Sequence, residues 1–186
     1  MSGKVAEKAV YKVFIAAPIE TVWSELVKTD EVLPFFFGAV CRTTGELAVG
    51  KPMAMETPNG KYRSVVGEVL EFSPPHRYAH TFKFTNVDDP PCVVIYELTE
   101  VDGGVEFSLI TENVPAGTQT EKTMAQGGPF ITKTLKEIAE TGKPSFGTSM
   151  MLSLMGLAAP FTPKSCLSEN WSFEKIAATA GKVDLV

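Results

Sequence analysis

The sequence has few of the residues from which metal sites and disulfide frameworks are built. It contains two histidines, His76 and His80, and three cysteines, Cys41, Cys92 and Cys166, in 186 residues. The cysteines lie far apart and form no CxxC pair, so neither a zinc site nor a set of disulfides is predicted. Reduced, buried thiols in a cytoplasmic protein are the simplest interpretation, and no metal is expected.

The sequence also lacks the features typical of nucleic-acid-binding proteins, membrane-spanning proteins and several enzyme classes. The formal net charge is −5, whereas a nucleic-acid-binding protein would usually show a basic face. No apolar run is long enough to span a membrane, and the first ten residues lack the apolar core of a signal peptide. The chain has no GxSxG motif and no Walker-type glycine loop, so no catalytic motif and no cofactor is indicated.

Residues 66–84 form the stretch around which the rest of the chain can be arranged. The stretch reads as a strand that ends at Ser73, a Pro74-Pro75 corner, and a second strand. Alternation along the second strand places Tyr78, His80, Phe82 and Phe84 on one face. Within this aromatic face, His80 is either a core histidine with a satisfied hydrogen bond or a group that contacts a ligand or handles a proton.

The order of the remaining segments predicts an α+β protein. Pro18 begins a short amphipathic helix, Thr29 caps a second short helix through Val32, and Thr118 and Glu121 form a capping box for a helix over residues 119–141, broken at Gly127-Gly128-Pro129. Further strands are predicted over residues 8–17, 40–47, 52–56, 92–100 and 105–112. Short turns between consecutive strands indicate a curved antiparallel sheet that grips the long C-terminal helix and leaves a hollow for a ligand.

The tail differs in character from residues 1–144, which are expected to form the folded domain. Residues 145–186 are read as a C-terminal extension that packs on this domain or on a partner subunit in a homodimer. The methionine-rich segment 150–157 could cover a pocket, form a subunit contact, or simply pack as a helix. Trp171, Phe173 and Ile176 are expected to anchor the end of the chain.

Four stretches, at residues 15–23, 67–78, 96–104 and 135–142, together resemble the START-like (SRPBCC) superfamily. Within that superfamily they are similar to homologues of the heat-shock-protein ATPase activator. The resemblance implies a helix-grip fold, also called pollen-allergen-like, with a hydrophobic cavity that binds lipophilic small molecules. The chain departs from the family pattern at Pro129-Phe130, where a Trp is frequent, and in its tail.

We carry three functional hypotheses forward. The first, a binding protein for a hydrophobic small molecule or lipid, is favoured over an enzyme. Its cavity would be lined by Trp23, Phe36, Met53, Met55, Tyr78, His80, Phe82, Tyr96, Phe107, Leu109, Phe130, Ile131 and Leu135. The second is a polyketide cyclase- or dehydratase-like enzyme in which His80 acts as general acid–base, helped by Tyr78 or Tyr96. The third, a chaperone-accessory role, is implied by the family resemblance alone.

Overall fold

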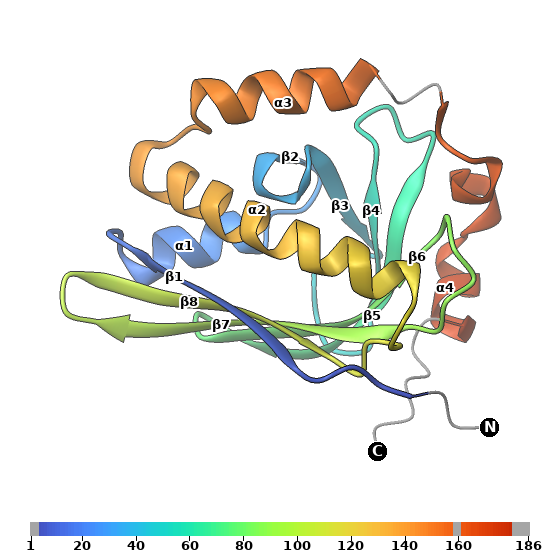
Figure 1. Cartoon of the computed structure of the whole chain (residues 1–186), viewed down its shortest axis with the longest axis horizontal. Helices are drawn as coiled ribbons and strands as arrows, with labels where there is room; N and C mark the ends of the chain where they lie inside the picture. Colours follow the sequence, from blue (N-terminus) through green and yellow to red (C-terminus); the bar gives the residue numbers. More distant parts are fainter. Residues whose placement is uncertain (1–3, 158–160, 180–186) are drawn as a thin grey trace.

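An eight-stranded antiparallel sheet frames the protein in the computed structural model, which describes residues 4–157 and 161–179 (Figure 1). The strands are β1 (Ala9–Ile15), β2 (Val32–Leu33), β3 (Ala39–Thr43), β4 (Pro52–Glu56), β5 (Arg63–Ser73), β6 (Arg77–Phe84), β7 (Cys92–Val101) and β8 (Gly104–Glu112). Their order across the sheet is β1-β8-β7-β6-β5-β4-β3-β2. Neighbouring strands other than β1 and β8 are consecutive in sequence, as the short turns predict.

Helix α2 (Gln119–Thr141) crosses the concave face of this sheet, with α1 (Ile19–Leu26) beside it (Figure 1). Helix α3 (Phe146–Leu157) lies above α2, and α4 (Phe173–Thr179) packs on β4 and β5. The described residues also include the 3-10 helices η1 (Pro34–Phe36), η3 (Lys164–Cys166) and η4 (Ser168–Asn170). The predicted α+β helix-grip fold is confirmed. None of the described helices combines the length and the apolar character that crossing a bilayer requires.

Local signals in the sequence account for both ends of α2. The Thr118 hydroxyl accepts a hydrogen bond from the Glu121 amide, and the Glu121 carboxylate accepts one from the Gly117 amide. Gly142 ends the helix in the left-handed conformation at φ 78°, which glycine adopts without steric cost. The buried side of the helix carries the predicted stripe of Ile131, Leu135 and Ile138.

The predicted break in this helix is wrong, because α2 runs without interruption through Gly127, Gly128 and Pro129. Pro129 lacks an amide hydrogen and so removes one bond of the helical ladder, the one to the Ala125 carbonyl. Packing against β1 and η1, which α2 contacts, keeps the two halves in one helix.

The short helix expected after Thr29 is also wrong. Val32 and Leu33 instead form strand β2, which pairs with β3 at the edge of the sheet. Asp30 takes a left-handed conformation at φ 63°, and its amide donates to the Cys41 carbonyl. The acidic, Thr-capped pattern suits a helix locally, but pairing with β3 decides the conformation.

The central hairpin forms as predicted, with a cis Pro74-Pro75 peptide joining β5 to β6. A shift in register between Val69 and Glu71 marks a bulge in β5, and bulges bend a strand and increase its twist. The rings of Tyr78, His80 and Phe82 follow one another along the inner face of β6. The hairpin therefore contributes an aromatic row to the concave side of the sheet.

Residues 171–179 pack on the outside of β4 and β5. Ile176 packs with Ala54 and Val66 in a small apolar cluster, and Trp171 and Phe173 lie against it. The Arg63 guanidinium lies 4.4 Å from the centre of the Phe173 ring and pairs with Glu56 at 2.9 Å. The same guanidinium donates to the Trp171 carbonyl. Residues 171–176 thus anchor the tail on the sheet.

Candidate functional site

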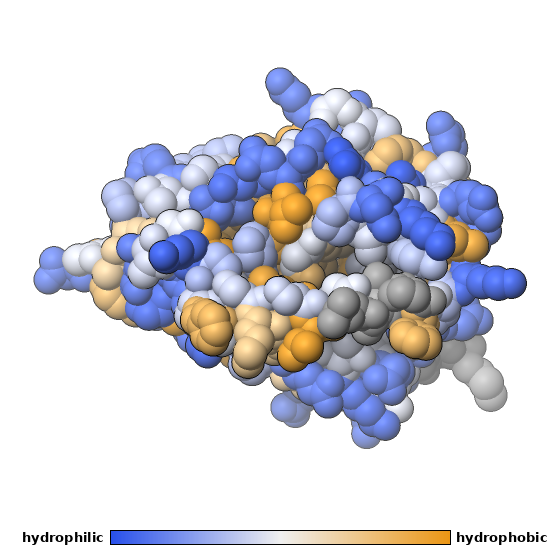
Figure 2. Space-filling model, turned by 90° about the horizontal axis from the view of Figure 1, so that it is seen from above, coloured by the Kyte–Doolittle hydropathy of each residue, from blue (hydrophilic) through white to orange (hydrophobic). Residues whose placement is uncertain are grey.

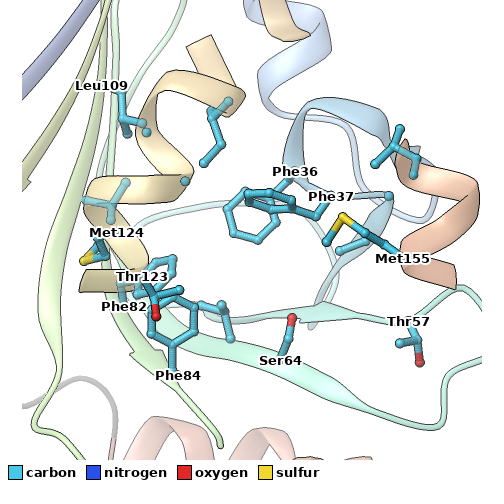
Figure 3. Close-up of a pocket in the computed structure, with 18 of the residues that line it drawn as sticks. Phe36, Phe37, Thr57, Ser64, Phe82, Phe84, Leu109, Thr123, Met124 and Met155 are labelled. Carbon is cyan, nitrogen blue, oxygen red and sulfur yellow. The ribbon is translucent and has the colours of Figure 1, made fainter. Parts of the chain in front are cut away.

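A pocket of about 710 Å³ lies between one end of the sheet, α2, η1 and α3. Figure 2, viewed from the side of α3, shows apolar side chains gathered around a hollow in this face of the molecule. Figure 3 shows the side chains that project into the hollow from these elements. The pocket is in the size range of sites that hold small organic ligands.

The sheet contributes the floor of the pocket through side chains of β5 to β8. On β7 and β8, Val94 pairs with Thr111 and Tyr96 pairs with Leu109, and all four border the pocket. Strand alternation places them on the concave face, and Phe82 extends the same surface onto β6. The floor is therefore apolar apart from the hydroxyl-bearing side chains of Ser64, Tyr96 and Thr111.

The run of three phenylalanines divides between the core and the pocket. Phe35 is buried in the core, whereas Phe36 and Phe37 border the pocket (Figure 3). Phe37 adopts a left-handed backbone at φ 55°, and its ring stacks on that of Phe130 with centroids 4.6 Å apart. Three consecutive phenylalanines cannot share one face, and the turn after η1 places one in the core and two at the pocket.

Helix α3 forms the outer wall of the pocket. Leu152, Met155 and Gly156 border it, and Met155 projects from α3 toward Phe36 and Phe37 (Figure 3). The opposite side of α3 remains apolar and exposed, with Phe146 85% accessible to solvent. Unbranched, polarizable methionine adapts to ligands of irregular shape.

Hydrogen bonds from the start of α3 attach it to α2. The Glu137 carboxylate accepts from the Ser145 amide at 3.0 Å and from the Thr148 hydroxyl at 2.9 Å. Burial alone would raise the pKa of Glu137, but these hydrogen bonds outweigh it and lower the pKa below its usual value. Glu137 therefore remains a carboxylate that holds α3 over the pocket.

The structure brings only part of the sequence-derived lining set to the pocket. Phe36, Phe82, Tyr96, Leu109 and Ile131 border it. The other members are packed in the core or, for Phe130, against Phe37: Trp23, Met53, Met55, Tyr78, His80, Phe107, Leu135 and Phe130. Alternation identifies which residues face inward from a strand but not which of them reach the pocket. Beneath α1 and the C-terminal half of α2, core side chains fill the interior.

Several bordering residues were not among those expected. They are Phe37, Thr57, Ser64, Phe84, Val94, Thr123, Met124, Gly127, Gly128, Leu152 and Met155, with further main-chain and small side-chain neighbours. Two signals could have located some of them. Adjacent glycines inside an amphipathic helix leave space on that helix, and an uncharged, methionine-rich segment has no polar face to turn toward solvent.

His80 lies inside the protein with 0% exposure and does not border the pocket. Its Nδ1 lies 2.8 Å from the Thr81 carbonyl oxygen, while its Nε2 has no partner in the described residues. Burial lowers the pKa of His80 to about 4 despite that hydrogen bond, which favours the charged form. The imidazole is thus neutral near pH 7 and lies beside the pocket without bordering it.

The buried thiols of Cys41 and Cys92 are also uncharged. Burial, with a smaller contribution from Asp30, raises the pKa of Cys41 to about 12, and burial raises that of Cys92 to about 12. All three cysteines are free. Across residues 4–157 and 161–179, no three His, Cys, Asp or Glu side chains come together as a metal site would require. The described site therefore offers apolar surface and neutral polar groups.

Sequence and structure comparisons place the chain among known proteins. A model of the family described as Activator of Hsp90 ATPase homolog 1-like protein matches residues 16–140. No curated protein matches the chain by sequence.

Three solved structures illustrate the likeness of fold. Protein CV1439 from Chromobacterium violaceum is 20% identical with a TM-score of 0.55, over 72% of this chain and 96% of that one. The Aha1 dimer from Colwellia psychrerythraea is 15% identical with a TM-score of 0.59, over 74% and 99%. PFC0360w from Plasmodium falciparum, described as an HSP90 activator, is 19% identical with a TM-score of 0.52, over 66% and 87%. At these identities the likeness shows the fold alone.

Proposed function

Since this chain belongs to the Activator of Hsp90 ATPase homolog 1-like family, we propose that it uses the pocket of its fold to bind a hydrophobic small molecule or lipid. The observation that carries the proposal is the apolar pocket of about 710 Å³. Its lining combines aromatic rings from η1 and the sheet with methionines from α2 and α3. An apolar ligand would gain roughly 25 cal/mol for each Å² of apolar area it buries, before the costs of ordering.

The polar groups at the pocket are few and uncharged, which suits a lipophilic ligand with little charge. The hydroxyl-bearing residues that border the pocket are Thr57, Ser64, Tyr96, Thr111, Thr123 and Thr162. The Ser64 hydroxyl already donates to the Met55 carbonyl at 3.2 Å. Tyr96 and Thr111 are therefore the side chains in the floor best placed to orient a polar group of the ligand.

Filling the pocket from Gly127 tests this proposal. A Cβ atom at Gly127 would lie 3.5 Å from the Phe37 ring, an ordinary van der Waals contact, so α2 accepts a side chain there. Gly127→Leu would place a branched side chain in the pocket while improving the helix propensity of α2. The matched control is Gly147→Leu on α3, where nothing lies within 4 Å and the residue does not border the pocket.

The measurement is a titration of both variants and the wild type with the neutral fluorescent probe N-phenyl-1-naphthylamine. We expect saturable binding at one site in the wild type and in Gly147→Leu. Gly127→Leu should bind at least about tenfold more weakly, because its side chain occupies the volume the probe needs. Absence of saturable binding to the wild type, or equal binding by the two variants, would contradict the proposal.

The description of the family, together with the description of PFC0360w as an HSP90 activator, supports a second proposal. In this proposal the chain is a chaperone-accessory protein. Addition of the chain to purified Hsp90 should then raise its rate of ATP hydrolysis. An unchanged rate at saturating chain, with a known activator as positive control, would reject it.

A further inference from the structure

Two buried polar atoms without hydrogen-bond partners lie beside the floor of the pocket, on the same concave face of the sheet. His80 Nε2 and the Tyr78 hydroxyl have no hydrogen-bond partner in the described residues, although His80 is 0% and Tyr78 is 2% exposed. Their rings are neighbours on the inner face of β6, with centroids 5.1 Å apart. Leaving a buried polar atom without a partner is unfavourable, so a pair of them in one place calls for an explanation.

The hydrogen-bond chemistry of each group can be assigned. The Thr81 carbonyl oxygen can only accept, so His80 Nδ1, 2.8 Å away, carries the proton and donates it. Nε2 is then a bare acceptor in the neutral ring. Burial raises the pKa of Tyr78 well above its usual value, so its hydroxyl keeps its proton and can both donate and accept. Together the two groups present one acceptor and one donor-acceptor, with no charge.

Strand register places this pair one side chain away from the pocket. His80 pairs across the sheet with Val94, and Tyr78 pairs with Tyr96, and both partners border the pocket. The Tyr96 ring lies 5.7 Å from that of Tyr78 and 5.8 Å from that of His80. Phe82, which also borders the pocket, lies 6.2 Å from His80. The Tyr96 ring thus lies next to both members of the polar pair and also borders the pocket.

We propose that His80 and Tyr78 form a polar subsite at the inner end of the pocket that takes a neutral hydroxyl group of an apolar ligand. The hydroxyl would donate to His80 Nε2 and accept from the Tyr78 hydroxyl, which requires the Tyr96 ring to move aside. This inference rests on the proposed function, because it specifies the chemistry of the ligand in the same pocket.

The subsite selects an alcohol or a phenol over charged ligands. A carboxylate would meet the lone pair of His80 Nε2, and the pair offers it no positive charge. A cationic amine would be desolvated without a negative partner, which is costly in a buried site. A ligand that lacks any polar group would leave both buried atoms unsatisfied. A neutral hydroxyl satisfies both at once, since it carries one donor and two acceptor positions.

Matched naphthalene probes test the subsite by displacing N-phenyl-1-naphthylamine at pH 7. The probes are 2-naphthol, 2-methylnaphthalene and 2-naphthoate, which differ only in the group at one position. The test variant is Tyr78→Phe, which removes one hydroxyl and keeps the ring. The matched control is Tyr62→Phe, which removes a hydroxyl from a ring that does not border the pocket.

The quantity compared is the affinity of 2-naphthol divided by that of 2-methylnaphthalene. We expect this ratio to fall about tenfold in Tyr78→Phe and to remain unchanged in Tyr62→Phe, as loss of one buried hydrogen bond requires. We expect 2-naphthoate to bind most weakly. Without ligand, Tyr78→Phe should melt no lower than the wild type, because the deleted hydroxyl has no partner.

The outcomes separate this inference from the proposed function. An unchanged ratio in Tyr78→Phe, or tightest binding of 2-naphthoate, would overturn the polar subsite while probe binding still supports the pocket. Failure of N-phenyl-1-naphthylamine to bind the wild type would overturn the proposed function and the subsite with it.

Discussion

The two adjacent glycines of α2 should respond in opposite directions to the same substitution. A Cβ atom at Gly127 would make an ordinary contact with the Phe37 ring at 3.5 Å. A Cβ atom at Gly128 would lie 2.6 Å from the Tyr11 ring, which is too close for any real side chain. Gly128 also precedes Pro129, and proline disfavours the helical conformation in a preceding residue that carries a Cβ atom.

The structure sets the size of each effect on the free energy of unfolding. Gly127→Ala should stabilise the protein by about 0.5–1 kcal/mol, the helix-propensity difference between the two residues. Gly128→Ala should destabilise it by about 1–3 kcal/mol, the usual cost of overpacking, with the proline restriction in addition. In a chain of this length each kcal/mol shifts Tm by about 2–4 °C.

Thermal unfolding followed by circular dichroism, with urea titrations as a second measure, tests the pair. A double-mutant cycle with Tyr11→Ala separates the two causes at Gly128, because removal of the ring relieves the clash and leaves the proline restriction. If Gly128→Ala raised Tm as Gly127→Ala does, or if Tyr11→Ala left the cost of Gly128→Ala unchanged, the packing of α2 on β1 described above would be wrong.

Three further predictions concern the core, the cap and the outer wall of the pocket. Burial lowers the pKa of His80 to about 4, whereas the pKa of a histidine in an unfolded chain is near 6.5. The contribution of neutral His80 to the free energy of unfolding is therefore complete above pH 6.5, and about 3 kcal/mol of it is lost as the pH falls to 4. Urea unfolding across this range should show a shallower pH dependence in His80→Phe than in the wild type, and an equally steep dependence would contradict the burial of a neutral imidazole. Thr118→Ala should cost about 1 kcal/mol, because α2 loses its N-cap acceptor, and Thr123→Ala is the control in urea unfolding. Glu137→Ala should release the start of α3, because the carboxylate accepts the hydrogen bonds that hold it. Limited proteolysis should then show faster cleavage within α3, and probe titration should show weaker binding. Cleavage no faster than in the control Lys133→Ala would contradict the role of Glu137 as the attachment point.

The sequence predicts the elements whose signals are local. The capping box at Thr118 and Glu121, the stripe on α2 and the aromatic alternation on β6 each depend on spacing within one segment, and each forms as expected. The stretch after Thr29 does not, because Val32 gains its conformation by pairing with Val40 on another strand. A local sequence pattern carries no information on pairing with a strand that is distant in the sequence.

The candidate site is harder to predict than the fold for the same reason. Tyr78, His80 and Phe82 share one face of one strand, yet only Phe82 borders the pocket. Position along β6 decides whether an inward-facing residue lies in the packed core or at the pocket, and alternation does not encode that position. Helix α3 is apolar all round, so its sequence gives no preferred face, and its place over the pocket depends on contacts such as those of Glu137.

The hollow between Phe37, Leu109 and Met155 is the proposed ligand site. A crystal structure of the wild-type protein saturated with N-phenyl-1-naphthylamine would show whether it is occupied. We predict electron density for the probe among these three side chains, with α3 in contact with it. A hollow closed by its own side chains, or a probe bound elsewhere on the molecule, would contradict the account.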